Sequence, residues 1–147
     1  ETNFITGTLT TQIDTLGTVS LGSDLQLKGV LPDETLVKDQ SVSIAIRPEK
    51  ISVFPVQGVY HRIDGQAISS DEFRALLDAQ PDTTLLNGTI EDIHYIGTDN
   101  RYDIALSNDA RVVARVQNFG QRFANDYQVG DSVYVFWDHT NARILSH

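Results

Sequence analysis

Residues 41–54, SVSIAIRPEKISVF, alternate apolar and polar side chains as a β-strand does, with one interruption. Apolar residues fall at every second position up to Ile46, the pattern stops at Arg47-Pro48-Glu49, and it resumes at Ile51. Proline lacks a backbone N–H and pushes the preceding residue into extended geometry, so the strand should end at a defined residue. We therefore expect a corner between a long strand and a short one. Turn chemistry alone favours an architectural role for it.

Alternation with a period of two recurs along most of the chain. It predicts further strands at 4–13, 19–31 (a two-stranded ribbon), 85–96, 101–106, 111–117, 132–137 and 142–145. The pair Asn108-Asp109 is typical of a tight turn, which predicts a hairpin from the two strands around it. Short strands at regular spacing indicate an all-β barrel or sandwich.

One segment, SSDEFRALLDAQPD, has the period of a helix instead. Ser69 and Glu72 form a capping box, Phe73 and Leu77 fall on one face, and Pro81 ends the segment. The helix could plug one end of a barrel, or its apolar edge could contact another subunit.

Two motifs occur twice, in the same order. FITGTLTTQI at 4–13 matches LLNGTIEDIH at 85–94, and VKDQSVSIAIRPEKISV at 37–53 matches VGDSVYVFWDHTNARIL at 129–145. We therefore predict two related OB-like Greek-key β-barrel units in tandem, with strands that could be exchanged between the repeats, and one short helix. The expected boundaries are 3–56 for the first repeat, 57–84 for a helical insertion and 85–145 for the second repeat.

Composition excludes several classes of function. The net charge is −9, from 11 basic and 20 acidic residues, which argues against nucleic acid as a partner. The chain has no cysteine, so disulfides and thiolate metal sites are excluded. No apolar run approaches the ~20 residues that span a bilayer. The sequence begins at Glu1 and contains no methionine, so we expect it to be a piece of a longer polypeptide.

Four of these stretches resemble one protein family. IRPEKI, ETNFITGTL, GTIEDIHYIGTDNRYDI and VGDSVYVFWDHTNARIL, taken together, are similar to the accessory C-terminal domain of bacterial ABC-importer ATPases, the transport-associated OB (TOBE) domain. The resemblance covers most of the chain except residues 57–84. Among its subgroups, the pattern looks closest to the ATPase subunits of polyamine (spermidine/putrescine) and ferric-iron importers, with the polyamine type preferred.

The resemblance implies a non-catalytic regulatory and assembly domain, which could also sense a small cytoplasmic ligand. It implies pairing with a second copy of the ATP-binding subunit, contact with permease subunits through an ATPase domain absent from this sequence, and a place on the cytoplasmic side of the bacterial inner membrane. ATP and Mg would belong to the parent chain, because no Gly-x-x-x-x-Gly-Lys-[Ser/Thr] loop occurs here. No cofactor is expected within the chain. The alternative is a stand-alone OB-like module that senses an oxyanion, a metal or a polyamine.

The candidate regulatory or interface residues combine the corner, an acidic-aromatic stretch and two phenylalanines. They are Arg47, Pro48, Glu49, Tyr95, Gly97, Asp99, Arg101, Tyr102, Phe119 and Phe123. Asp92, Asp99 and Asp103 with Tyr95 and Tyr102 would suit an amine cation, although acidic surface strands are common. Phe119 and Phe123 could form part of a self-complementary patch, or seal the open end of the second barrel. The four histidines, His61, His94, His139 and His147, lack the i, i+4 spacing of metal ligands, and no metal site is expected.

Overall fold

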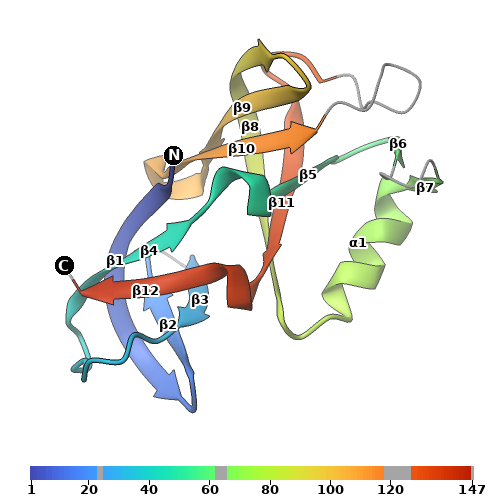
Figure 1. Cartoon of the computed structure of the whole chain (residues 1–147). Coiled ribbons are helices and arrows are strands. Elements are labelled where there is room, and N and C mark those ends of the chain that lie inside the picture. The colour runs from blue at the N-terminus through green and yellow to red at the C-terminus, as the bar shows by residue number, and fades with distance from the viewer. Residues whose placement is uncertain (23–24, 62–65, 118–126, 147) are drawn as a thin grey trace.

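A computed structural model of the chain describes residues 1–22, 25–61, 66–117 and 127–146 (Figure 1). Its elements are β1 (Asn3–Ile13), β2 (Leu16–Ser20), β3 (Gln26–Val30), β4 (Ser41–Ile46), η1 (Pro48–Lys50), β5 (Ser52–Pro55), β6 (Val59–His61), β7 (Ala67–Ser69), α1 (Ser70–Asp78), β8 (Thr83–Ile96), β9 (Asp99–Leu106), η2 (Ser107–Asp109), β10 (Arg111–Gln117), β11 (Ser132–Asp138), η3 (His139–Asn141) and β12 (Ala142–Ser146). The predicted hairpin is present as β9 and β10, and its turn residue Asp109 has a φ of 61°.

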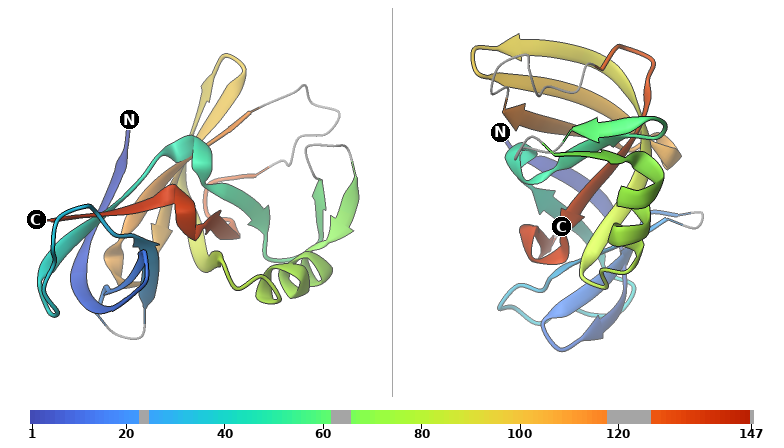
Figure 2. Two further views of the ribbon diagram at one scale, coloured as in Figure 1. Left: turned by 60° about the horizontal axis from the view of Figure 1, so that its bottom comes forward. Right: turned by 90° about the vertical axis from the view of Figure 1, so that its right-hand side faces the viewer.

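Ten of the strands form two five-stranded units, which Figures 1 and 2 show side by side, and β6 and β7 pair in a separate two-stranded sheet. The first is a closed barrel in the order β1-β2-β3-β12-β4, and the second is a sheet in the order β10-β9-β8-β11-β5. One continuous cluster of buried apolar side chains runs through both units, from Leu9 and Ile44 in the first to Ile104 and Trp137 in the second. The all-β fold with two OB-like units and one short helix is therefore as the sequence predicts.

The units exchange one strand each. The last strand, β12, inserts between β3 and β4 of the first barrel, while β5 pairs with β11 at the edge of the second sheet. Ser52–Pro55, which the predicted boundaries place in the first repeat, thus contributes to the second unit. The corner at Arg47-Pro48-Glu49 is the crossing point: β4 ends there and the chain passes into the other unit, as it does again between β11 and β12.

The two repeats share detailed backbone geometry. Leu9 exchanges hydrogen bonds with Asp39 and Gln40, and Ile90 makes the same pair with Gly130 and Asp131. The predicted match of Val37-Lys38-Asp39 with Val129-Gly130-Asp131 is therefore wrong by one residue. Asp39 corresponds in space to Gly130, and both have positive φ, 69° and 95°. An aspartate tolerates a positive φ better than most residues, so Asp39 can stand where the second repeat has a glycine. Matching Asp39 with Asp131 by residue type therefore gives the wrong register.

The helix α1 begins as predicted, with the Ser69 hydroxyl accepting a hydrogen bond from the Glu72 N–H. It does not plug a barrel. Phe73 packs against Phe54 and Phe136 in a separate aromatic cluster on the outer face of β5 and β11. Alternation along β11 sends this face away from the main core, so it needs a cover of its own, and α1 supplies one.

Candidate functional site

Charged side chains gather on the outer face of the β8–β9 hairpin. His94 lies opposite Arg101 in the pairing of the two strands, and Asp92 lies opposite Asp103. A bulge between Ile90 and Asp92 shifts the register by one residue. Without that shift the side chains of Asp92 and His94 would turn to the inner face, because the side-chain period of a strand is two.

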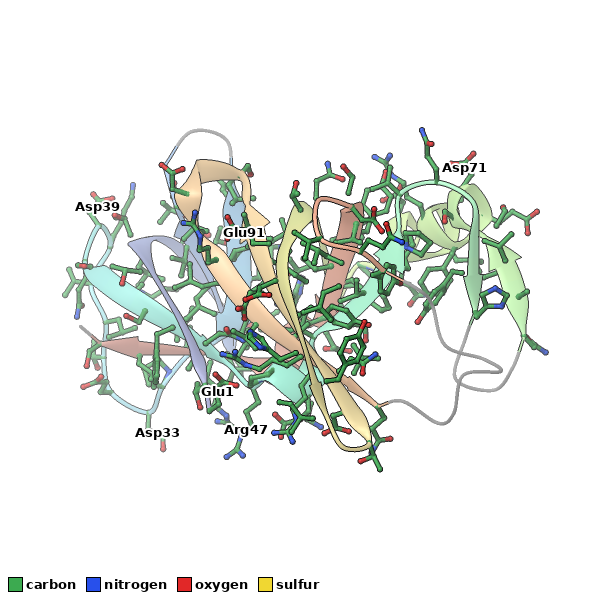
Figure 3. The ribbon with its side chains drawn as sticks, turned by 90° about the horizontal axis from the view of Figure 1, so that it is seen from above. Glu1, Asp33, Asp39, Arg47, Asp71 and Glu91 are labelled. Carbon is green, nitrogen blue, oxygen red and sulfur yellow. The ribbon has the colours of Figure 1, made fainter. Side chains whose placement is uncertain are left out.

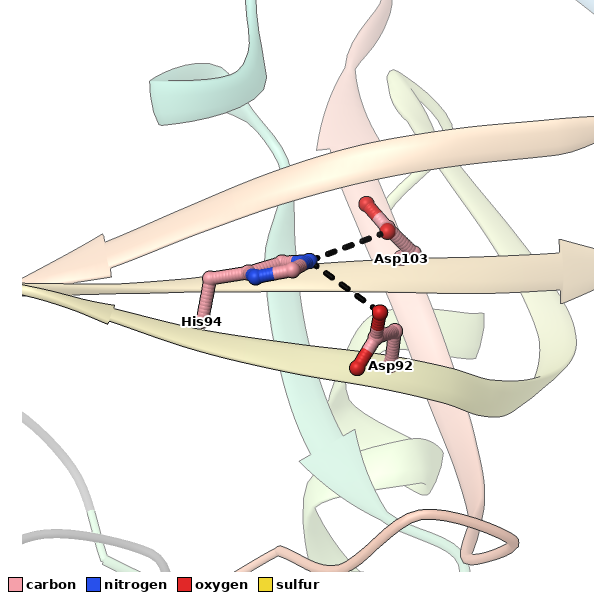
Figure 4. Close-up of side chains that lie close together, drawn as sticks. All are labelled: Asp92, His94 and Asp103. Atoms are coloured by element: carbon pink, nitrogen blue, oxygen red, sulfur yellow. Dashed lines mark ion pairs between the residues drawn. The ribbon is translucent and has the colours of Figure 1, made fainter.

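Asp92, His94 and Asp103 converge on one point of this face (Figure 4). The Nε2 atom of His94 lies 3.2 Å from Oδ2 of Asp92 and 3.6 Å from Oδ2 of Asp103. All three side chains are partly open to solvent, Asp103 least, at 32%. The arrangement can hold a cation with two carboxylates and one imidazole, or it can serve as a small ion-pair network.

Arg101 borders this cluster and connects it to the start of the chain. Its Nη2 and Nε atoms donate to the two carboxylate oxygens of Glu1, at 2.7 and 3.3 Å. These hydrogen bonds lower the pKa of Glu1. A single longer ion contact, 3.5 Å, joins Arg101 to Oδ1 of Asp103.

A second contact holds the first strand against the second sheet. The side-chain amide of Asn3 donates to the carbonyl of Val113 at 2.9 Å and accepts from its N–H at 2.8 Å. Asn3 is 7% exposed. Its side-chain amide pairs with the backbone of Val113 as a residue of an additional strand beside β10 would. The beginning of the chain is fastened to the second unit by Glu1 and Asn3, although β1 belongs to the first.

The predicted acidic-aromatic site does not assemble. Tyr102, predicted as a regulatory or interface residue, is 3% exposed and packs edge-on against Tyr127 in the core. Tyr95 is 72% exposed and lies opposite Asn100, on the inner side of the hairpin. The failure has a simple cause: successive side chains on β9 point to opposite faces, which separates Tyr102 from its acidic neighbours.

The remaining predicted residues have separate places. Asp99 pairs with Arg115 at 2.7 Å, and Gly97 provides the positive φ, 60°, of the β8–β9 turn. At the corner, Pro48 is buried, while Arg47 and Glu49 are exposed; Figure 3 shows Arg47 projecting outward. Phe119 and Phe123 lie outside the described residues.

The reading of the sequence missed His94 as a candidate ligand. The i, i+4 spacing is that of ligands on a helix, whereas His94 lies on a strand, where ligands share a face at i, i+2. The Asp-x-His spacing of residues 92–94 was an available signal. The cross-strand partner Asp103 was not, because its position depends on the bulge.

Comparison with known proteins gives the family. The TOBE domain family matches residues 44–145. Over 145 residues the chain is 24% identical to the spermidine/putrescine import ATP-binding protein PotA of Thermobifida fusca (strain YX); the match covers 97% of this chain and 31% of that protein. The chain thus spans about a third of the length of this curated relative.

The solved structures show the same fold. The chain superposes on the cytoplasmic molybdate-binding protein ModG with molybdate bound, with a TM-score of 0.66, 14% identity, and coverage of 99% of this chain and 96% of that one. Within the ranges that the structure describes, no helix is long and apolar enough to cross a membrane. The family match spans most of the chain and agrees with the two exchanged β units, and we conclude that the chain belongs to the TOBE domain family.

Proposed function

We propose that this chain is the regulatory and assembly domain of the ATP-binding subunit of an ABC importer for polyamines. One observation carries the proposal: almost the whole chain, 97%, aligns with less than a third of a spermidine/putrescine import ATP-binding protein. The TOBE domain is a non-catalytic module. In the intact subunit, ATP and Mg would bind to the remaining part.

The proposed role places the domain at the cytoplasmic face of the inner membrane, beside permease subunits and a second copy of the ATP-binding subunit. The predicted pairing needs a self-complementary surface, because two identical subunits meet across a two-fold axis. The interfaces of weak complexes bury less than ~1,200 Å² in total, and the isolated domain would keep only part of the contact area. We expect a monomer–dimer equilibrium at high micromolar concentration.

The contacts at the beginning of the chain support a coupling role. Because Glu1 and Asn3 bind the second unit, a displacement of the chain before them would pull on β9 and β10 directly. One closely packed apolar core runs through both units, so the two units should move together as one rigid body.

The second candidate is a stand-alone module that binds a small ligand. Its support is the likeness in fold to ModG, a molybdate-binding protein. For an oxyanion the electrostatics are unfavourable, because the chain carries a net charge of −9 and Arg101, Arg111 and Arg115 each pair with a carboxylate. The importer domain is therefore the better-supported proposal.

Two observations test the proposal. The coding sequence upstream of Glu1 should contain a Walker-type phosphate loop, and a start codon directly before Glu1 would favour the stand-alone module instead. Sedimentation velocity over a concentration series should show dimers at high micromolar concentration. A strict monomer at millimolar concentration would contradict pairing through this domain.

A further inference from the structure

We propose that Asp92, His94 and Asp103 form a binding site for one divalent transition-metal cation of the Zn²⁺ type. This site is independent of the proposed transport role, since it uses only side chains of the β8–β9 hairpin. It has three ligands on two paired strands: Asp92 and His94 from β8 and Asp103 from β9.

The two separations between His94 and the aspartates fit a tetrahedral metal. Two ligands bound to Zn²⁺ at about 2.0 Å in tetrahedral geometry are about 3.3 Å apart. The two separations from Nε2 of His94 are 3.2 and 3.6 Å, and all three ligand atoms lie within 4.8 Å of one another. The two pairs that include His94 thus lie within a few tenths of an ångström of this spacing, while the two carboxylate oxygens, up to 4.8 Å apart, would have to approach each other by up to about 1.5 Å for an ion to enter.

The local charges favour a cation despite the neighbouring arginine. Arg101 directs two of its donors to Glu1, at 2.7 and 3.3 Å. It reaches Asp103 through one contact of 3.5 Å, to Oδ1, whereas Oδ2 is the oxygen that faces His94. Oδ1 of Asp103 is shielded from solvent and accepts no hydrogen bond in the part of the chain that the structure describes. The oxygen of Asp103 that faces His94 is thus not the one that Arg101 contacts.

The first repeat shows that the fold does not require these residues. Its β1–β2 hairpin has the same bulge, between Leu9 and Thr11, and Thr11 lies opposite Thr18 as Asp92 lies opposite Asp103. The counterparts of the triad are Thr11, Ile13 and Thr18, which include no charged or imidazole side chain. The same backbone is stable with non-ligating residues, so packing does not explain the triad.

The ligand chemistry selects among cations. Mg²⁺ and Ca²⁺ prefer oxygen-only shells with six or more ligands, whereas Zn²⁺ binds imidazole and carboxylate readily with four. Three protein ligands leave the fourth position open. Because the site is partly exposed, that position is accessible to water or to a donor group from another molecule.

The first test titrates the purified 147-residue chain with Zn²⁺ alone in a calorimeter. We expect one equivalent to bind, and Mg²⁺ to give no signal at the same concentration. His94→Gln and Asp92→Asn should weaken binding roughly tenfold or more, because the loss of an outer-shell partner alone costs 10–100-fold. Two variants serve as controls. Glu91→Gln removes a negative charge from the same strand outside the triad, and His61→Gln removes another exposed histidine. Both controls should bind Zn²⁺ as the wild type does.

Unchanged affinity in His94→Gln, or an equal loss in Glu91→Gln, would overturn the proposal. A transplant gives the converse test: Thr11→Asp, Ile13→His and Thr18→Asp together should create a second equivalent of Zn²⁺. A folded transplant that still binds one equivalent contradicts the geometric argument. If the transplant does not fold, the absorption of bound Co²⁺ decides: tetrahedral d–d bands must appear in the wild type and vanish in His94→Gln.

Discussion

Replacing Asn3 by alanine tests how the first strand is held against the second sheet. The change removes two hydrogen bonds, of 2.8 and 2.9 Å, and leaves both backbone groups of Val113 without their partner. A net intramolecular hydrogen bond contributes about 0.5–1.5 kcal/mol, and a buried group left unpaired costs about 1–3 kcal/mol. Val113 is only part-buried, so we expect the lower range to apply and the free energy of unfolding to fall by about 2–3 kcal/mol.

The assay is urea unfolding followed by circular dichroism, with thermal melts as a second measure. For a chain of this size the expected loss lowers the melting temperature by about 5–10 °C. Thr6→Ala is the control, because Thr6 is exposed on the same strand, and surface changes stay within about 0.5 kcal/mol. A loss of 0.5 kcal/mol or less in Asn3→Ala would refute the view that this amide fastens the units together.

Three further changes have expected outcomes. In Gly7→Ala the new Cβ would lie 2.6 Å from the carbonyl oxygen of Ser20, so unfolding free energy should fall by about 1–3 kcal/mol, and an unchanged urea midpoint would contradict this. Burial and the charge of Lys28 lower the pKa of His139 below its usual 6.5. Asp138 and Asp82 act in the opposite direction and reduce this shift. The unfolded chain then binds the proton more readily, so this part of the stability is present above pH 6.5 and is lost as the pH falls. In His139→Leu, the free energy of unfolding, measured with urea, should decline less between about pH 7 and 5 than in the wild type. An unchanged decline would contradict this role of His139. Arg47→Ala should cost less than about 0.5 kcal/mol, because the side chain is exposed, while it impairs pairing or coupling; unfolding of the domain would show that the corner is purely architectural.

The sequence predicted features whose cause is local. Alternation and turn residues gave the strands, the Ser69 cap gave the start of the helix, and the proline gave the corner. The repeated Gly-Thr-[Leu/Ile] motif predicted the two units. Its glycine is needed in both repeats, because the neighbouring strand approaches closely: a Cβ on Gly88 would lie 2.5 Å from the side chain of Ile104.

Features that depend on pairing were beyond the sequence. The alternation in β5 and β12 predicts strands but not the strands they pair with, so the exchange could only be raised as an option. The bulge in β8 decides which side chains share a face with Asp103, and no residue in it is a glycine that would signal it. The single-residue slip at Asp39 has the same origin, since the positive φ falls on an aspartate in one repeat and on Gly130 in the other.

The most direct test of the proposed function is transport by a chimera. The segment of the Thermobifida fusca spermidine/putrescine import ATP-binding protein that matches this chain would be replaced by residues 1–147, and spermidine uptake and ATP hydrolysis measured with the permease present. The proposal predicts that the chimera takes up spermidine at a rate well above that of a subunit with the segment deleted, with hydrolysis coupled to uptake. A chimera that folds and hydrolyses ATP, yet transports no better than the deletion, would contradict it.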